Sequence, residues 1–267
     1  GLTPDISEAF ADAAIELINT RPKEPFFLQV CFTAPHDPLL MPTGYETKYD
    51  PQTLPLPANF LPRHPFDHGN FSGRDELLFE WPRTPEMVRE ELAVYYALIS
   101  HVDEQVGRIV QALETTGQRE RTLILYSSDH GLAIGSHGLR GKQNCYEHTI
   151  NVPLVMNGPG IPKGQTHSAQ CYLRDLFPTV CELAQIAIPK TVEGKSLVPV
   201  IQGQQDSIYD YVFGYFRQSQ RMIRSEDYKL IQYPQAKQAQ LFHLPSDPVE
   251  LKNLIDVPEH AETRRRL

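Results

Sequence analysis

Apolar positions recur with helical spacing in two parts of the chain. Between residues 4 and 20 they follow a Thr-Pro-Asp sequence, in which Thr is a typical cap and Pro a typical first helical residue. A second apolar face runs from Leu92 to Leu113 after another Thr-Pro pair, and Gly117 marks its end. The pattern therefore predicts one helix over about 4–20 and a longer helix over about 84–117.

Two short apolar runs lack the polar face of a helix and predict buried strands. Residues 26–32 and 122–127 are rich in β-branched, aromatic and leucine side chains. With the long helix between them they form a β-α-β pattern, whose right-handed crossover places the two strands parallel in one sheet. A further strand over 152–156 and a further helix over about 175–185 fit the same layered α/β domain.

The pattern changes after residue 203. Tyr209, Tyr211 and Phe213 alternate, and short runs over 221–224 and 228–233 predict strands with a turn over 225–227 between them. We therefore expect residues 1–203 to form the main α/β domain and residues 204–267 to form a small antiparallel sheet.

A long irregular segment separates the first predicted strand from the long helix. Ten of the 23 prolines lie between Pro35 and Pro85, and no periodic pattern is present there. Such a segment in a compact domain is either functional or disordered. Its His64, His68 and Arg74 can line a substrate pocket, although surface exposure is an equal alternative.

Composition narrows the class of protein. The 267 residues are 40% hydrophobic and 22% charged, which is typical of a globular chain. No apolar run approaches the roughly 18 residues of a membrane span. The net charge of −8 argues against a protein that coats nucleic acid. Four cysteines without a C-x-x-C pair are too few for a disulfide framework, and the first residues carry no leader pattern.

Polar side chains follow the two predicted parallel strands where each strand ends. His36 follows the first strand, and Asp129 and His130 follow the second, with Gly131 permitting a sharp turn. Because the carboxyl ends of parallel strands meet at one edge of a sheet, we expect these side chains to converge. A carboxylate suits Ca²⁺ or Mg²⁺, and an imidazole also suits Zn²⁺. The equal alternative is that Asp129 caps a turn and His130 bonds to backbone.

A glycine-rich loop over residues 135–142 ends in Lys142, 13 residues after Asp129. Glycine beside lysine lets the backbone approach an anion while the ammonium group acts on it as a point charge. His137 and Arg140 in this loop are more simply interpreted as solvated residues. His148, which lies just beyond, is more simply a packing residue.

In combination these motifs resemble the sulfatase family (arylsulfatase-like) of the alkaline phosphatase superfamily. The strands and final motif of its C-terminal subdomain also have counterparts, at Arg221–Arg224 with Tyr228–Leu230 and at Leu241–Leu244. The other matching segments, in the family's order and spacing, are Phe26-Phe27-Leu28, Ala34-Pro35-His36-Asp37-Pro38, Ser128-Asp129-His130-Gly131, Gly141-Lys142, Tyr146-Glu147, Val152-Pro153-Leu154 and Gly158-Pro159-Gly160.

The resemblance implies a fold and a set of roles. The fold is α/β, an alkaline-phosphatase-like sandwich with a mostly parallel central sheet flanked by helices, plus a small C-terminal antiparallel subdomain. The activity is hydrolysis of organic sulfate monoesters. Asp129 and His130 match ligands of a divalent cation, usually Ca²⁺. His36 matches the histidine that contacts the ester and protonates the leaving oxygen, and Lys142 matches the lysine that holds a sulfate oxygen. Positive groups around the ester stabilise the charge that develops on its oxygens.

One part of the family pattern is missing from the chain. The family's nucleophile is a formylglycine made within a C-x-[PA]-S-R-type motif, and an acidic pair completes the metal site. None of the four cysteines lies in such a motif, and there is no Asp-Asp pair. In the family these elements precede the segment matched here. We therefore expect this chain to be the C-terminal part of a sulfatase, inactive and without firmly bound calcium by itself, with the formylglycine supplied by a residue outside it.

Two other functions stay open. A phosphodiesterase or phosphonate hydrolase of the same superfamily is one, because Ser-Asp-His-Gly also resembles a metal-binding segment of its zinc phosphodiesterases. The other is a noncatalytic module that binds sulfated glycans through His36, Lys142 and Arg140. The spacing of Lys142 and the Ala34-Pro35-His36 sequence favour the sulfatase. We expect a sulfated small molecule or glycan as partner, no nucleic acid and no membrane span. The resemblance favours an exported location (periplasmic, extracellular or lysosomal-type) over a cytoplasmic one.

Overall fold

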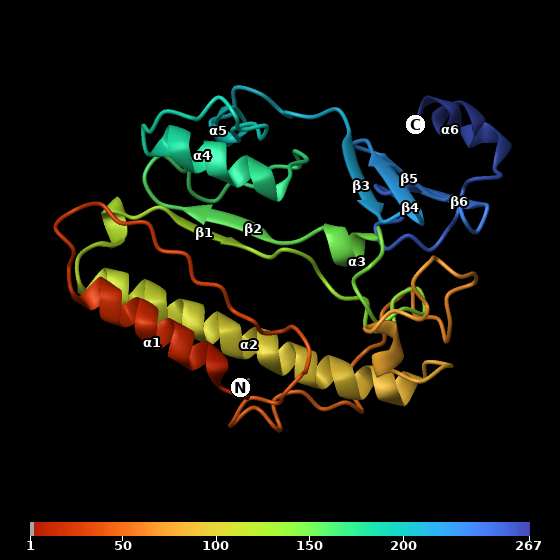
Figure 1. Cartoon of the computed structure of the whole chain (residues 1–267), viewed down its shortest axis with the longest axis horizontal. Coiled ribbons are helices and arrows are strands. Elements are labelled where there is room, and N and C mark those ends of the chain that lie inside the picture. The colour runs from red at the N-terminus through yellow and green to blue at the C-terminus, as the bar shows by residue number, and fades with distance from the viewer. Residues whose placement is uncertain (1–2) are drawn as a thin grey trace. The chain divides into compact units, whose positions relative to one another are not determined.

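The computed structural model describes residues 3–267, which form two compact units (Figure 1). The first unit comprises residues up to Leu56 together with Arg83–Thr122. The second comprises Pro57–Pro82 and Leu123–Leu267. Both units are thus discontinuous in sequence, because the segment 57–82 belongs with the C-terminal part of the chain.

The first unit contains two long helices, α1 (Ile6–Asn19) and α2 (Pro85–Thr115). They lie side by side and run in the same direction (Figure 1). The Thr84 side chain caps the start of α2. Arg108 of α2 donates a hydrogen bond to Asp12 of α1 at 2.5 Å, which links the two helices. Both helices occur where the apolar spacing and the capping residues predict them.

The run 26–32 is not a strand in this structure. Phe27 is 79% exposed, and no strand or isolated bridge in the described part of the chain pairs with this run. A buried strand needs hydrogen-bonded neighbours at its edges and packing on its faces. Residues 3–267 provide neither, so the predicted strand and the β-α-β unit built on it are absent here.

A two-stranded sheet lies in the second unit. It is formed by β1 (Ile124–Ser127) and β2 (Leu154–Asn157), close to the predicted strands over 122–127 and 152–156. Their pairing is antiparallel, with Ile124 opposite Asn157. A parallel neighbour would require the crossover from 26–32, and that run does not join the sheet. The mostly parallel central sheet is therefore not confirmed within residues 3–267.

Several short elements complete the middle of the chain. The helix predicted over 175–185 is confirmed as α4. The short elements are η1 (Glu76–Leu78), η2 (Arg119–Arg121), α3 (Glu147–Ile150), η3 (Leu173–Asp175), α4 (Leu176–Leu183) and α5 (Val198–Ile201).

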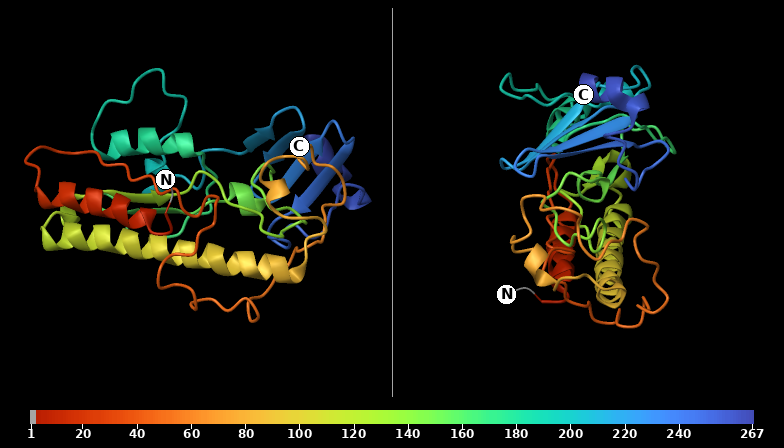
Figure 2. Two further views of the ribbon diagram at one scale, coloured as in Figure 1. Left: turned by 60° about the horizontal axis from the view of Figure 1, so that its bottom comes forward. Right: turned by 90° about the vertical axis from the view of Figure 1, so that its right-hand side faces the viewer.

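The predicted C-terminal antiparallel sheet is confirmed and has four strands, which lie side by side in Figure 2. Its core includes Met222, Ile231 and Phe242, which pack with Tyr146 and Leu139 from outside the sheet. The boundary at residue 203 stays a prediction. The elements are β3 (Val212–Phe216), β4 (Gln220–Arg224), β5 (Tyr228–Tyr233) and β6 (Gln238–His243), paired in that order, followed by η4 (Pro258–His260) and α6 (Ala261–Arg266).

The proline-rich segment contributes buried side chains to the second unit. His64 and His68 are only 3% and 1% exposed, so surface exposure is wrong for both, whereas the Arg74 side chain is 64% exposed. His64 Nε2 lies 2.8 Å from the Tyr146 hydroxyl. Gln220 donates a hydrogen bond to the His68 carbonyl at 3.1 Å. These contacts join the segment to the loop before α3 and to the C-terminal sheet.

Among residues 3–267, no helix combines the length and the apolar character that crossing a membrane requires.

Candidate active site

Asp129 and His130 lie immediately after β1, as predicted. The His130 N–H donates to Asp129 Oδ1 at 2.9 Å, and His130 Nε2 lies 3.5 Å from Asp129 Oδ2. His130 Nδ1 is also 3.1 Å from the Gly131 carbonyl oxygen. The Asp129 side chain is 80% exposed and that of His130 is 29% exposed. The turn and backbone contacts of the alternative interpretation are therefore present, and the role of the pair as cation ligands stays a prediction.

The next residue has to be glycine. The Gly131 N–H donates to the Thr149 carbonyl at 2.8 Å, and a Cβ at Gly131 would lie 2.0 Å from the His148 carbonyl oxygen. Any larger residue would push the chain away from the segment 148–149. Gly131 therefore fixes the direction in which the chain leaves the Asp129-His130 pair.

The loop that leads to Lys142 is folded back on itself. The Gly135 N–H donates to the Leu139 carbonyl at 2.8 Å, and the Ala133 N–H donates to the Gly141 carbonyl at 3.1 Å. Gly138 has a φ of +70°, and a Cβ there would lie 2.3 Å from the backbone of Arg63. The hairpin returns the chain so that Lys142 starts close to the segment after His130.

His137 and Arg140 are buried, at 6% and 3% exposure, so the prediction that they are solvated is wrong. The His137 ring stacks on Tyr146 with centroids 3.8 Å apart, and its Nε2 lies 3.1 Å from Asn59 Nδ2. Burial lowers the pKa of His137 to about 3, so the ring is neutral. The ring of His148 lies 5.7 Å from that of Tyr146, which agrees with its predicted packing role.

Two acidic residues of the proline-rich segment hold the Lys142 loop. The Glu76 carboxylate accepts the backbone N–H groups of Arg140 at 3.0 Å and Gly141 at 2.8 Å. Asp75 Oδ2 lies 3.9 Å from Lys142 Nζ. Asp75 and Glu76 are buried, and the Lys142 side chain is 16% exposed. Neither acid belongs to a motif predicted from the sequence, although adjacent carboxylates in an otherwise irregular segment are a visible signal.

A buried ion-pair network lies beneath α3. Lys229, on β5, is fully buried with its Nζ 2.7 Å from Glu147 Oε1 and 2.5 Å from Glu250 Oε1. The Glu147 N–H donates to Glu250 Oε2 at 2.7 Å. Burial raises the pKa of the Glu250 carboxyl, while the Lys229 charge and hydrogen bonds counteract that rise. The network anchors the start of α3, next to Tyr146, to the C-terminal sheet.

His36 belongs to the first unit, whereas Asp129 and Lys142 belong to the second. It is exposed, its N–H donates to the Thr33 carbonyl at 2.9 Å, and its Nδ1 lies 3.0 Å from the Asp37 carbonyl oxygen. The turn therefore presents the imidazole at the surface of its own unit. Its convergence with the other three residues stays a prediction.

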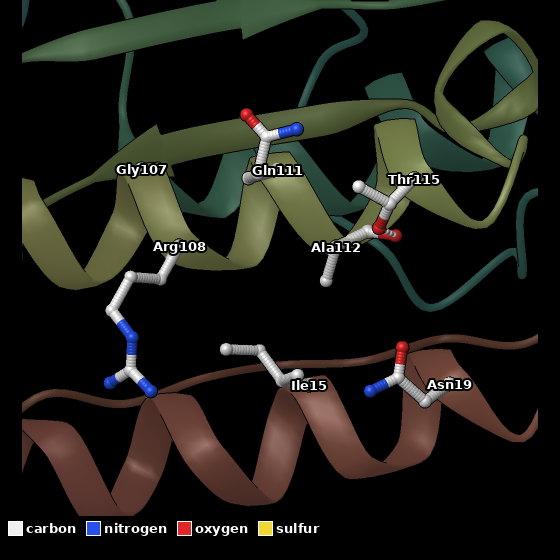
Figure 3. Close-up of a pocket in the computed structure, with 7 residues that line it drawn as sticks. All are labelled: Ile15, Asn19, Gly107, Arg108, Gln111, Ala112 and Thr115. Atoms are coloured by element: carbon white, nitrogen blue, oxygen red, sulfur yellow. Dashed lines mark hydrogen bonds between the residues drawn. The ribbon is translucent and has the colours of Figure 1, made fainter.

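A hollow of about 510 Å³ lies between α1 and α2 (Figure 3). Arg108, Gln111 and Thr115 line its α2 side, and Ile15 and Asn19 line its α1 side. It contains none of the predicted site residues.

The sulfatase family model matches residues 3–186, more than half of the chain. The chain belongs to the sulfatase family. A second model, described as N-sulphoglucosamine sulphohydrolase, C-terminal, matches residues 135–267 of this sulfatase chain. The resemblance drawn from its motifs is thereby confirmed, together with membership of the alkaline phosphatase superfamily.

Three known proteins illustrate the likeness. An arylsulfatase of Clostridium perfringens is 33% identical over 257 residues, covering 93% of this chain and 53% of that protein. A structure solved in complex with its substrate D-glucosamine-2-N,6-O-disulfate has a TM-score of 0.81 at 21% identity, covering 98% of this chain and 67% of that one. A phosphonate monoester hydrolase from Silicibacter pomeroyi has a TM-score of 0.81 at 27% identity, covering 97% of this chain and 57% of that one. The alkaline-phosphatase-like fold is therefore shown, and this chain spans about half the length of the arylsulfatase it matches.

Proposed function

We propose that this chain is the C-terminal part of a sulfatase and supplies a cation-binding pair and a sulfate-binding lysine for the hydrolysis of organic sulfate monoesters. The observation that carries the proposal is the pairing of an exposed carboxylate at Asp129 with a neighbouring imidazole at His130, beside a loop that Glu76 holds in place. The substrate is a sulfated small molecule or glycan. The whole protein is exported, as its family resemblance suggests.

The Asp129-His130 pair fits part of a divalent-cation site. Its carboxylate is accessible and its imidazole has a nitrogen 3.5 Å from that carboxylate. Ca²⁺ takes roughly six to eight ligands, so two side chains cannot complete its shell. The remaining ligands would come from the family's acidic pair and formylglycine, outside this chain. A bound Ca²⁺ would supply positive charge next to the sulfate oxygens.

Lys142 is suited to hold a sulfate oxygen. Its backbone follows a loop held by Glu76, and Asp75 lies within ion-pair distance of its ammonium group. A fixed ammonium stabilises the charge that develops on the ester oxygens without reorganising during the reaction. We assign Lys142 to substrate binding and to stabilisation of the transition state.

His36 is assigned to the leaving group. An exposed imidazole can donate a proton to a departing alcohol oxygen.

Phosphonate ester hydrolysis is the second candidate, because the phosphonate monoester hydrolase likeness has the same TM-score as that of the disulfate complex. The glycan-binding alternative is weaker, because Arg140 is buried and its backbone is held by Glu76. The test measures kcat/KM of the full-length protein for an aryl sulfate and for the matching aryl phosphonate ester. We expect the sulfate to be preferred by at least tenfold. A preference for the phosphonate ester would overturn the assignment, and hydrolysis of neither would favour a binding function.

A further inference from the structure

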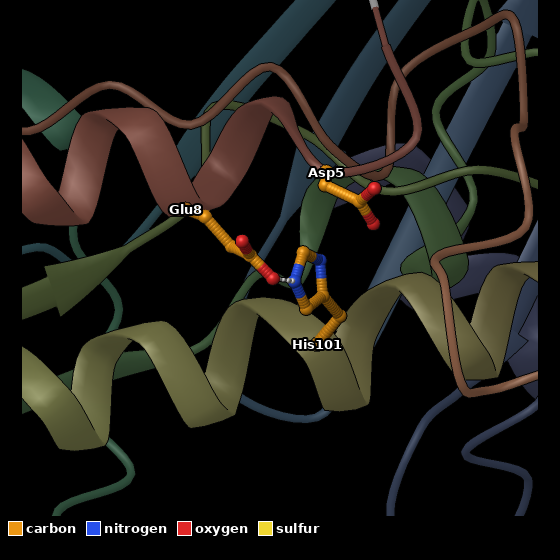
Figure 4. A group of neighbouring side chains, drawn as sticks. All are labelled: Asp5, Glu8 and His101. Carbon is orange, nitrogen blue, oxygen red and sulfur yellow. Dashed lines mark hydrogen bonds and ion pairs between the residues drawn. The ribbon is translucent and has the colours of Figure 1, made fainter.

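Three potential metal ligands meet between the start of α1 and the middle of α2 (Figure 4). Asp5 precedes α1, Glu8 lies in its first turn, and His101 lies in the middle of α2. One ligand atom from each residue lies within 4.8 Å of the others. The three side chains belong to the same compact unit and include none of the residues assigned to sulfate hydrolysis.

His101 is the most unusual member of the group. It is 2% exposed, its Nε2 lies 3.4 Å from Glu8 Oε1, and its buried Nδ1 has no hydrogen-bond partner. In Figure 4 the imidazole lies between the two carboxylates, with Nε2 joined to Glu8 and the other nitrogen on the side of Asp5. A buried polar atom without a partner is costly, and a metal ion is one partner that would satisfy a ring nitrogen.

Glu8 determines which ring nitrogen of His101 can bind a metal. Its Oε1 lies 3.4 Å from Nε2, in a long hydrogen bond in which the carboxylate accepts the Nε2 proton. The lone pair of the neutral ring is therefore on Nδ1, the buried atom without a partner. Glu8 keeps its second carboxylate oxygen for an ion.

Asp5 is oriented by a neighbour in the way that metal-binding carboxylates usually are. Its Oδ1 accepts the Thr43 N–H at 3.0 Å, and its Oδ2 accepts the Thr43 hydroxyl at 2.8 Å. These bonds lower the pKa of Asp5, so the carboxylate stays ionised. Each oxygen keeps a second lone pair for an ion. Hydrogen bonds of this kind fix the direction of a ligand before the metal binds.

The surroundings of His101 carry more negative than positive charge. Tyr45 packs edge-on against its ring at 5.5 Å and donates a hydrogen bond to Glu104. Burial, Glu104 and nearby acids including Glu8 raise the pKa of the Tyr45 hydroxyl to about 12. Lys48, whose ammonium lies 4.9 Å from the centre of the Tyr45 ring, is the cation on this side. With Asp5 included, the carboxylates outnumber the ammonium group.

We propose that Asp5, Glu8 and His101 bind a divalent transition-metal ion of the zinc class, with water as a further ligand. Two carboxylates and one imidazole form a mixed donor set that zinc commonly accepts. The ion joins the beginning of α1 to the middle of α2. Its role is to stabilise the pairing of the two helices.

The test uses full-length protein carrying Asp129→Asn, so that the carboxylate of the proposed calcium pair is absent and a change caused by Glu8→Gln reports on the second site. Zn²⁺ alone is titrated by calorimetry and retained metal is counted after dialysis, while thermal unfolding is followed with Zn²⁺ and with Ca²⁺. We expect one Zn²⁺ per chain and a rise in Tm with Zn²⁺. Glu8→Gln should weaken Zn²⁺ affinity at least tenfold and abolish the rise in Tm.

Glu8→Gln is the decisive variant because the Glu8 side chain is 53% exposed and its replacement leaves the core intact. Glu16→Gln, at an exposed position on the same helix, is the matched control and should bind Zn²⁺ normally. Equal Zn²⁺ affinity in Glu8→Gln and Glu16→Gln would overturn the proposal, as would no Zn²⁺ binding in the parent protein. Either result leaves sulfate hydrolysis by the Asp129 and Lys142 site untouched.

Discussion

The Glu76 carboxylate accepts the backbone N–H of Gly141 at 2.8 Å, although the two residues are 65 positions apart in the sequence. The same carboxylate accepts the N–H of Arg140. A residue in the proline-rich segment therefore determines where the Lys142 loop lies. The segment is part of the site's support rather than a disordered connection.

Replacing Glu76 by Ala should lower stability and weaken substrate binding. The change leaves two N–H groups of buried residues without acceptors, at a cost of about 1–3 kcal/mol for each group. Glu76→Gln keeps one acceptor oxygen and should lose about half as much. Urea unfolding and the KM for a sulfate ester measure the two effects. Lower stability with an unchanged KM would show that Glu76 supports the fold without positioning Lys142.

Acidification should destabilise the second unit through its buried histidines. Burial lowers the pKa of His64 to about 4 and those of His68 and His137 to about 3, against 6.5 in the unfolded chain. Between pH 6.5 and these values the unfolded chain binds protons that the folded chain excludes, so stability falls as pH falls. At pH 5 each imidazole costs about 2 kcal/mol relative to pH 7.

His68→Leu tests this linkage at one position. Both ring nitrogens of His68 are buried without hydrogen-bond partners, so the substitution removes a titrating group and breaks no side-chain hydrogen bond. The difference in unfolding free energy between pH 7 and pH 5 should shrink by about 2 kcal/mol in the variant. An unchanged difference would show that His68 is protonated in the folded protein at pH 5.

Lys229→Met should be strongly destabilising. It leaves the buried Glu250 without its ammonium partner, and the loss of one member of a buried ion pair typically costs about 3–5 kcal/mol. Glu147 keeps Arg224, whose Nε lies 3.6 Å from Oε1. Denaturant unfolding measures the loss. Lys252→Met, at an exposed position, is the control and should stay close to the parent protein. Equal stability of the two variants would contradict the anchoring role given to Lys229.

Asp129→Asn should weaken Ca²⁺ binding by the full-length protein at least tenfold while leaving stability unchanged, because the side chain is 80% exposed. Asp206→Asn, another exposed carboxylate, should have no effect. Calorimetric titration with Ca²⁺ provides the measurement. Equal affinity in both variants would remove Asp129 from the set of cation ligands.

The sequence predicts well the elements whose pattern is local. The helices α1 and α2 combine an apolar face with a Thr-Pro start, and the strands β4 and β5 are short apolar runs joined by a turn. The strand predicted over 26–32 is wrong. An apolar run indicates that a segment prefers burial, but it does not show which other segments would cover it. The antiparallel pairing of β1 and β2 is likewise decided by neighbours that composition does not show.

The residues of the candidate site also differ in whether a local sequence pattern predicts them. Asp129, His130 and Lys142 are recognisable from local motifs. The burial of Arg140 is not, because it depends on Glu76, 64 positions away, and glycine-rich charged loops usually lie in solvent. Lys229 and Glu250, whose ion pair anchors the start of α3, also come from distant parts of the chain. Only the fold brings such partners together.

The most direct test of the account is the hydrolysis of an aryl sulfate by full-length protein carrying Lys142→Ala. Its matched control is Lys163→Ala, which removes an exposed lysine from a different loop. Loss of a fixed ammonium that stabilises transition-state charge should lower kcat/KM at least a hundredfold, with circular dichroism and Tm close to those of the control. Turnover by Lys142→Ala equal to that of Lys163→Ala would contradict the proposed sulfatase site.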